Sequence, residues 1–240
     1  MIDIHNHILF DIDDGCRSIE ESLILLKKME EIGFNKIILT PHYIKGTTYT
    51  IDNKIKEIKL NQLQYQLNKQ KINIKLYLGN EIFITDNIVE LLRINVVSSI
   101  NKGRYILIEL PFENEIIGLA DILYELKYHN LIPIIAHPER YTYFQNNNKK
   151  IQELRKEGIL FQVNYSSILG YYGRKAKKTT KYLLKNNYID FFGTDIHRCN
   201  KTYVLDNFKK IEKKIIRIIG NKNYNKIIKN SEKIINNENI

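Results

Sequence analysis

Short apolar runs recur along this chain, and each one is followed by a histidine or a carboxylate. The runs and the residues that follow them are 2–4 before His5 and His7, 37–39 before His42, 76–78 before Glu81, 106–108 before Glu109, 134–136 before His137, and 191–192 before Asp195 and His197. Such runs, separated by stretches of helical periodicity, are typical of buried parallel strands in a repeated βα unit. In a closed barrel of such units, functional side chains lie at the carboxyl ends of the strands. The sequence therefore predicts an α/β barrel that gathers nitrogen and oxygen ligands at one end.

The order of elements along the chain alternates strand and helix. We expect strands near residues 2–5, 36–40, 74–79, 104–109, 132–136, 159–163 and 189–194, with helices near 53–70, 86–93, 116–129, 148–157, 175–187, 203–219 and 223–236. A further helix is expected to begin after Ser18, which forms a capping-box pattern with Glu21, and to end at Gly33. The prediction is thus a barrel of seven strands, which is an unusual count.

Length and composition favour a single domain over residues 1–240, because α/β barrels typically run to about 250 residues around one core. No apolar stretch approaches the roughly 18 residues that a membrane span requires, and no signal-peptide pattern precedes the first strand. The two cysteines exclude a disulfide framework and fit a reducing compartment. We therefore expect a cytoplasmic protein, and the sequence is compatible with an oligomer.

The formal net charge of +10 raises the question of a polyanionic partner. Residues 201–240 carry ten Lys or Arg against four Asp or Glu, so this segment holds most of the excess. It also has the pattern of an amphipathic helix, which favours a solvated outer face over a polyanion site. Since the lysines lie mostly away from the histidine and carboxylate motifs, nucleic acid is an unfavoured partner.

The histidines and carboxylates at the strand ends indicate a metal site. His5 and His7 are two apart on a strand end, so their side chains leave the same face, and Asp195 and His197 repeat this spacing. Burying so many titratable groups without a cation would be very costly. Imidazole and carboxylate ligands without thiolate suit manganese, zinc or ferrous iron.

Other hydrolytic chemistries lack their motifs. Neither Cys16 nor Cys199 begins a C-x5-R loop, because the residues six positions later are Ser22 and Leu205. No GxSxG elbow, P-loop or GxGxxG pattern is present. Metal-assisted hydrolysis is the chemistry that remains.

The motifs together resemble a known superfamily. They are His5-Asn6-His7-Ile8-Leu9, Ile12-Asp13-Asp14-Gly15, Thr40-Pro41-His42, Gly79-Asn80-Glu81, Ala136-His137-Pro138-Glu139-Arg140, Gln162-Val163-Asn164 and Asp195-Ile196-His197. This set resembles the PHP (polymerase and histidinol phosphatase) superfamily and, within it, the manganese-dependent capsular polysaccharide tyrosine phosphatases of the CpsB and YwqE type. The resemblance implies a distorted seven-stranded (β/α)7 TIM-like barrel that holds three metals, most often manganese.

The resemblance also implies ligand sets for the three metals. The first would take His5, His7, Glu81 and Asp195, the second Glu81, Glu109 and His137, and the third Asp14, His42 and His197. Asp13 is the adjacent alternative to Asp14, because turn chemistry cannot choose between neighbours. Arg140 would bind the substrate phosphate and, with Glu109 and His42, belong to the catalytic residues. The alternative for Arg140 is a surface ion pair with Glu139.

The chain departs from the family pattern at two places. Phe10 and Asp11 stand where Pro-Gly is usual, so the first loop is expected to have a different shape. A second arginine expected beyond the final ligand pair is absent. Thr202 lies near its position, and Arg198 and Lys201 are the candidate substitutes.

The resemblance implies metal-dependent hydrolysis of phosphotyrosine. The expected partner is a bacterial tyrosine kinase that regulates capsule or exopolysaccharide synthesis. One alternative is another phosphoesterase on the same scaffold, such as a histidinol-phosphate or nucleotide phosphatase. Another is a non-catalytic metal-bound module that docks on a partner.

Overall fold

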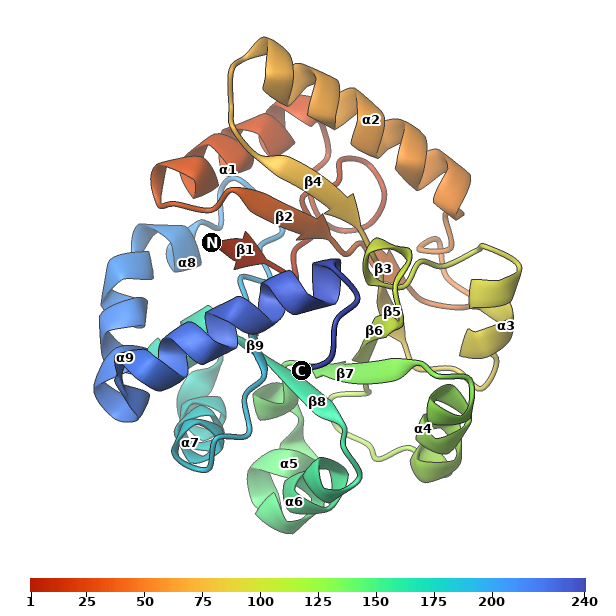
Figure 1. Cartoon of the computed structure of the whole chain (residues 1–240), viewed down its shortest axis with the longest axis vertical. Coiled ribbons are helices and arrows are strands. Elements are labelled where there is room, and N and C mark those ends of the chain that lie inside the picture. Colours follow the sequence, from red (N-terminus) through yellow and green to blue (C-terminus); the bar gives the residue numbers. More distant parts are fainter.

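Nine short parallel strands form two sheets in the computed structural model, which describes all 240 residues (Figure 1). The strands are β1 (Ile2–Asp3), β2 (Lys36–Leu39), β3 (His42–Tyr43), β4 (Lys75–Leu78), β5 (Glu81–Phe83), β6 (Tyr105–Glu109), β7 (Ile132–Ala136), β8 (Leu160–Asn164) and β9 (Phe191–Gly193). One sheet has the order β1-β2-β4, and the other has the order β3-β5-β6-β7-β8-β9. Every neighbouring pair is parallel, as the apolar runs predict.

The count is nine instead of seven because two short strands, β3 and β5, follow just beyond the ends of the expected strands 36–40 and 74–79. Pro41, which has no N–H to donate to a ladder, separates β2 from β3, and Gly79 and Asn80 separate β4 from β5. The two chain segments stay side by side across the break, since the Glu81 N–H donates to the Pro41 carbonyl at 3.2 Å and the Asn80 side chain donates to the same oxygen at 2.9 Å. Each interruption is thus followed by a short strand that begins with a histidine or a glutamate.

The two sheets are also joined beyond the ends of β1 and β9. Asn6 and Ile196 form an isolated parallel bridge, the Asp195 N–H donates to the His5 carbonyl at 2.8 Å, and the His7 N–H donates to the Ile196 carbonyl at 2.9 Å. These bonds hold the first ligand motif, His5 and His7, against the last one, Asp195 and His197, although the two motifs are distant in the sequence.

Helices surround the curled parallel sheet (Figure 1). They are α1 (Ile19–Glu31), α2 (Asn53–Lys69), α3 (Ile88–Arg93), α4 (Leu119–Tyr128), α5 (Thr142–Asn146), α6 (Asn148–Lys156), α7 (Gly173–Lys185), α8 (Tyr203–Asp206) and α9 (Phe208–Ile235), with 3-10 turns η1 (Ile100–Lys102), η2 (Pro138–Arg140) and η3 (Tyr165–Leu169). The Ser18 side chain caps α1 by accepting from the Glu21 N–H, as predicted. The helices expected at 203–219 and 223–236 are replaced by the short α8 and the long α9. The helix α9 is kinked at Gly220, where φ is +76°.

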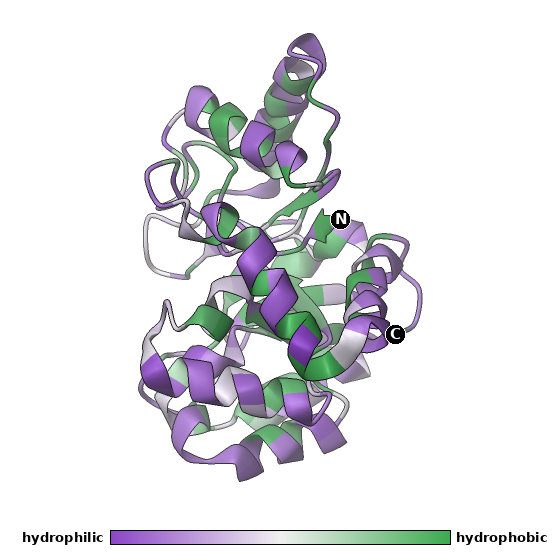
Figure 2. Cartoon of the chain, turned by 90° about the vertical axis from the view of Figure 1, so that its left-hand side faces the viewer, coloured by the Kyte–Doolittle hydropathy of each residue, from purple (hydrophilic) through white to green (hydrophobic).

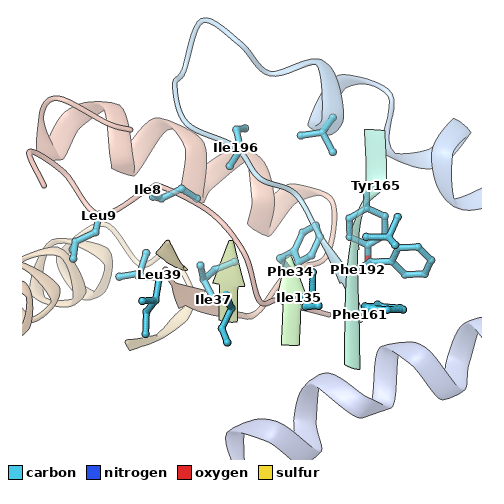
Figure 3. Close-up of a cluster of buried hydrophobic side chains, with 14 of the residues drawn as sticks. Ile8, Leu9, Phe34, Ile37, Leu39, Ile135, Phe161, Tyr165, Phe192 and Ile196 are labelled. Carbon is cyan, nitrogen blue, oxygen red and sulfur yellow. The ribbon is translucent and has the colours of Figure 1, made fainter. Parts of the chain in front are cut away.

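Side chains of each strand alternate between two apolar layers. Ile37 and Leu39 of β2 belong to the larger cluster beneath the helices, whereas Ile38 belongs to a smaller cluster inside the curl of the sheets. Figure 3 shows part of the larger cluster, with Ile37 and Leu39 beside Ile8 and Leu9. In Figure 2, hydrophobic residues lie mainly in the interior of the molecule, and hydrophilic residues lie mainly along the outer helices.

The end of α9 closes the interior at the amino ends of the strands. Ile234 and Ile235 pack in the inner cluster, and the Asn230 side chain donates to the Asp190 carbonyl at 3.0 Å. Figure 1 shows α9 crossing in front of the strands at this end. The opposite, carboxyl ends of the strands are therefore the side on which a site can form.

None of the helices combines the length and the apolar character needed to cross a lipid bilayer.

Candidate metal centre

Nine histidines and carboxylates meet at the carboxyl ends of the strands. His5 and His7 follow β1, His42 begins β3, Glu81 begins β5, Glu109 ends β6, His137 follows β7, Asp195 and His197 follow β9, and Asp14 lies in the loop after His7. The structure thus brings together every metal ligand that the sequence predicts.

Glu81 lies at the centre of this group. Its Oε2 atom is 3.2 Å from His5 Nε2, 3.3 Å from His7 Nε2 and 3.1 Å from His42 Nδ1. Its Oε1 atom is 2.9 Å from His137 Nε2. Glu109 approaches the same nitrogen atoms of two of these histidines, at 3.7 Å from His42 Nδ1 and 3.8 Å from His137 Nε2. One carboxylate therefore faces four imidazoles that come from three separate parts of the barrel.

Three overlapping groups have ligand atoms close enough to share a cation. They are His5, His7 and Glu81; His42, Glu81 and Glu109; and His7, Asp14, His42 and His197, with all ligand atoms of a group within 4.8 Å of one another. Asp195 Oδ1 lies 3.6 Å from both His5 Nε2 and His7 Nε2. Ligands bound at about 2.1 Å are separated by roughly 3.0 to 3.4 Å in octahedral or tetrahedral geometry. The contacts of Glu81 Oε2 with His5, His7 and His42 fall within that range, and those of Asp195 are slightly longer.

Three buried atoms of the group have no hydrogen-bond partner, and one of them is His137 Nδ1. The other two are His42 Nδ1 and Glu81 Oε2, which face each other at 3.1 Å. Buried polar atoms are rarely left without a partner, because desolvation is then uncompensated. A divalent cation would satisfy both His42 Nδ1 and Glu81 Oε2, so the residues present fit a metal centre.

Three members of the group have pKa values that suit cation binding, whereas for His5 and His7 the surrounding carboxylates outweigh burial and raise the pKa. Burial opposes charge on Glu81, but His5 and His42 outweigh it and hold the pKa of this carboxyl well below its ordinary range. Burial raises the pKa of Glu109, and the neighbouring Glu81 raises it further. Burial lowers the pKa of His137 to about 4, with the Arg140 charge acting in the same direction. His137 is therefore a neutral imidazole, the form that coordinates metals, and a cation would displace the proton of Glu109.

Hydrogen bonds behind the group orient three of the histidines. His5 Nδ1 is 2.7 Å from Gln162 Oε1, His7 Nδ1 is 2.7 Å from Asp13 Oδ2, and His197 Nδ1 is 3.0 Å from the Asp195 carbonyl. An Nδ1–H donor to each oxygen leaves Nε2 unprotonated and facing the group. Such outer partners set the tautomer and ring orientation of metal-binding histidines.

Two of the strand-end residues have an unusual backbone conformation. His137 has φ +33° and Asp195 has φ +53°, in the left-handed region that side chains other than glycine rarely adopt. Residues held in this way cost about 1–3 kcal/mol each and concentrate at functional sites. Here the left-handed turn follows directly after β7 and β9 and brings both side chains into the group.

The adjacent residues Asp13 and Asp14 occupy different environments. The Asp13 carboxylate is fully buried, where it accepts from the His42 N–H at 2.8 Å and contacts His7. Asp14 is 48% exposed, and its Oδ1 lies 3.8 Å from His42 Nε2 and 3.7 Å from His197 Nε2. Asp14 therefore belongs to the group of candidate ligands, and Asp13 orients His7 from behind.

The first loop returns the chain to His7 in a tight path. The Cys16 N–H donates to the His7 carbonyl at 3.1 Å, and a Cβ atom at Gly15 would lie 1.9 Å from that oxygen. Only glycine fits this approach. Asp11, at one of the positions that departs from the family pattern, has φ +52° and accepts a hydrogen bond from Lys59 Nζ at 2.7 Å.

Arg140 points into the site instead of pairing with Glu139. Its Nη1 donates to Asp195 Oδ2 at 2.9 Å, whereas Glu139 accepts from Ser167 Oγ at 2.6 Å on the other side. The alternative of a surface ion pair with Glu139 is therefore wrong. It failed because η2 turns neighbouring side chains in different directions, which sequence adjacency does not show.

A cavity of about 420 Å³ opens beside the group of ligands. Its lining includes Asp14, Arg140, Asp195 and His197, together with Arg198, Lys201, Tyr171, Tyr172 and Tyr203. Arg198 and Lys201, the candidate substitutes for the absent second arginine, both line this cavity. The cavity combines positive charge and aromatic surface next to the candidate metal ligands.

Among the residues that contact the site, Gln162, Asn164, Phe112 and Tyr172 were not predicted from the sequence as site residues. Gln162 and Asn164 are in β8, while Phe112 and Tyr172 are in loops, so only Gln162 lies within the expected strand 159–163. Its polar side chain in an otherwise apolar strand is a signal that could have been followed. Nothing in the local pattern distinguishes Phe112 or Tyr172 from the other aromatic residues.

The fold and the group of ligands define a parallel α/β protein with a strand-end metal centre. A sequence model of the family "Capsular polysaccharide synthesis, CpsB/CapC" matches residues 1–236. The chain therefore belongs to the CpsB/CapC family, which confirms the resemblance seen in its motifs.

Individual relatives agree with this family. A CapC protein of Staphylococcus aureus is 39% identical over 207 residues, covering 85% of this chain and 80% of that protein. The tyrosine-protein phosphatase CpsB of Streptococcus pneumoniae is 33% identical over 204 residues, covering 82% and 83%. A solved structure, from work on YwqE of Bacillus subtilis and CpsB of Streptococcus pneumoniae described as metal-dependent tyrosine phosphatases, superposes with a TM-score of 0.93 at 28% identity, over 100% of this chain and 96% of that chain.

Proposed function

We propose that the protein is a metal-dependent protein-tyrosine phosphatase. The observation that carries this proposal is the position of Glu81, whose unpartnered carboxylate oxygen faces three imidazole nitrogens at 3.1–3.3 Å. The names of the relatives and the close structural match support the same activity. The physiological substrate we propose is a phosphotyrosine protein, namely a bacterial tyrosine kinase that regulates capsule or exopolysaccharide synthesis.

The ligand atoms support three divalent cations, which we take to be manganese, with zinc and ferrous iron as alternatives. His5, His7, Glu81 and Asp195 would hold one, Glu81, Glu109 and His137 a second, and Asp14, His42 and His197 a third. When bound, such cations supply a water nucleophile of lowered pKa and neutralise charge on the phosphoryl oxygens. The overlap of the groups at Glu81 and His42 supports cations that lie close together.

Arg140 would bind the phosphoryl group from the side of the cavity. Its guanidinium carries several N–H donors in one plane, which suits two phosphate oxygens. The leaving phenol has a pKa of about 10, so its departure needs little help from a general acid. No side chain of the site is required as a covalent nucleophile.

The chain architecture supports a closed barrel over residues 1–240, which we take as one domain. Treating β2 with β3 and β4 with β5 as two interrupted strands gives seven positions. The Asn6–Ile196 bridge supports closure between the first and last of these positions. This is the distorted (β/α)7 arrangement of PHP proteins.

Removal of the metals tests the function directly. Treatment with EDTA is expected to abolish release of phosphate from a phosphotyrosine peptide, and added Mn²⁺ is expected to restore it. The measurement is phosphate release before and after dialysis, with histidinol phosphate and a nucleoside monophosphate assayed in parallel. Activity that persists through chelation would reject the mechanism, and faster turnover of an alkyl phosphate would favour a different phosphoesterase.

Asp14→Asn and Asp13→Asn are expected to differ in their effects on metal content. Asp14→Asn removes a charged ligand from the group with His42 and His197, so we expect about one fewer bound metal per chain. Asp13→Asn removes the oriented partner of His7, which we expect to weaken metal binding by about 10- to 100-fold without removing a site. Elemental analysis and titration with Mn²⁺ measure both. Equal stoichiometry in Asp14→Asn and the unmodified protein would contradict the assignment of Asp14.

A further inference from the structure

The two carboxylate oxygens of Asp195 face different parts of the site. Oδ1 faces the candidate metal ligands, 3.6 Å from His5 Nε2 and His7 Nε2. Oδ2 faces the other way and accepts three hydrogen bonds, from Asn164 Nδ2 at 2.7 Å, Arg140 Nη1 at 2.9 Å and the Tyr172 hydroxyl at 3.2 Å. These donors determine which oxygen is presented to a cation.

Tyr172 contacts Arg140 as well as Asp195. The Arg140 guanidinium carbon lies 4.5 Å from the centre of the Tyr172 ring and 4.6 Å from the centre of the Phe112 ring. The guanidinium is therefore held between two aromatic faces. The Tyr172 hydroxyl also accepts from Asn164 Nδ2 at 3.2 Å, which leaves its own hydrogen to be donated to Asp195.

We propose that Tyr172 is a positioning residue that acts separately on metal binding and on phosphate binding. Its hydroxyl fixes Asp195 with Oδ1 toward the cations, and its ring holds Arg140 in the orientation that receives the phosphoryl group. The proposal rests on the proposed function, in which Asp195 is a metal ligand and Arg140 binds phosphate. Outer hydrogen bonds of this kind orient metal ligands, and an aromatic face stabilises a guanidinium through cation–π contact.

The two roles belong to different atoms of one side chain, so conservative variants can separate them. Tyr172→Phe keeps the ring and removes the hydroxyl. We expect it to weaken Mn²⁺ binding by about tenfold. At saturating Mn²⁺ we expect its KM for a phosphotyrosine peptide to stay within about twofold of the unmodified protein, because the stack on Arg140 remains. Calorimetric titration with MnCl₂ measures the first effect without any assay of activity.

Tyr172→Leu and Phe112→Leu complete the comparison. Tyr172→Leu loses both features, so we expect the weakened Mn²⁺ binding of Tyr172→Phe and, in addition, a KM raised by about five- to tenfold. Phe112→Leu removes the opposite ring and touches no oxygen of Asp195. It should raise KM by a similar factor, and KM is its only readout because the Phe112 ring also stacks on the candidate ligand His137, with ring centres 5.7 Å apart. Tyr128→Phe, on the exposed face of α4, is the matched control and should change neither quantity.

The result that would overturn the inference is Mn²⁺ binding by Tyr172→Phe equal to that of the unmodified protein. A KM for Tyr172→Leu equal to that of Tyr172→Phe would also overturn it. Failure of the proposed function is a separate observation, since the unmodified protein would then release no phosphate from the peptide or would be insensitive to EDTA.

Discussion

Glu81→Gln is expected to reduce turnover of a phosphotyrosine peptide by at least about 10³-fold, because it removes the charge around which the site is organised. The Glu81 carboxylate lies within 3.3 Å of nitrogen atoms of His5, His7, His42 and His137. A neutral amide of the same shape places an NH₂ group against one of these nitrogens and would be a weaker ligand for a divalent cation. We therefore expect fewer bound metals per chain, which elemental analysis measures beside kcat.

The control is Glu90→Gln on the exposed face of α3. It makes the same chemical change outside the site and should retain full activity. Circular dichroism should show that Glu81→Gln keeps its secondary structure. A Glu81→Gln protein that is folded and retains a tenth or more of the normal rate would show that the reaction does not depend on cations at this position.

The sequence predicts the candidate ligands well because strand ends in a parallel sheet have a simple geometric consequence. Runs such as 106–108 and 134–136, separated by stretches of helical periodicity, are typical of buried strands, and residues that follow parallel strands lie at one edge. Glu109 and His137 therefore had to be neighbours once the sheet formed. The two-residue spacing of His5 and His7 gives a common direction for their side chains in the same way.

The sequence could not predict features that depend on tertiary contacts. The strands β3 and β5 are too short to be recognised from the sequence, so only the strands at 36–40 and 74–79 are predicted there. The sequence also does not show in which direction neighbouring side chains of a turn point. For this reason it could not predict which of Asp13 and Asp14 faces the ligands, or that Arg140 and Glu139 point in different directions. Tyr172 reaches Asp195 from the loop before α7, and no periodicity marks that contact.

Arg140 has the second largest expected effect, and two replacements separate its charge from its shape. Arg140→Met is expected to lower kcat/KM for a phosphotyrosine peptide by about 10²- to 10³-fold, because charge-assisted hydrogen bonds to the phosphoryl oxygens are lost. The affinity for Mn²⁺ should change much less than kcat/KM, since Asp195 Oδ2 keeps its hydrogen bonds from Asn164 and Tyr172. The competitive inhibition constant of inorganic phosphate should rise with KM.

Arg140→Lys tests whether positive charge alone is sufficient at this position. An ammonium group cannot lie flat between the rings of Phe112 and Tyr172 or donate to two oxygens in one plane, so we expect it to recover no more than about tenfold of the loss in Arg140→Met. Full activity in Arg140→Lys would show that the aromatic sandwich has no part in phosphate binding. Because the guanidinium is already held by two rings and by Asp195 before substrate arrives, little side-chain entropy remains to be lost on binding, and this is the physical reason for expecting arginine to be required.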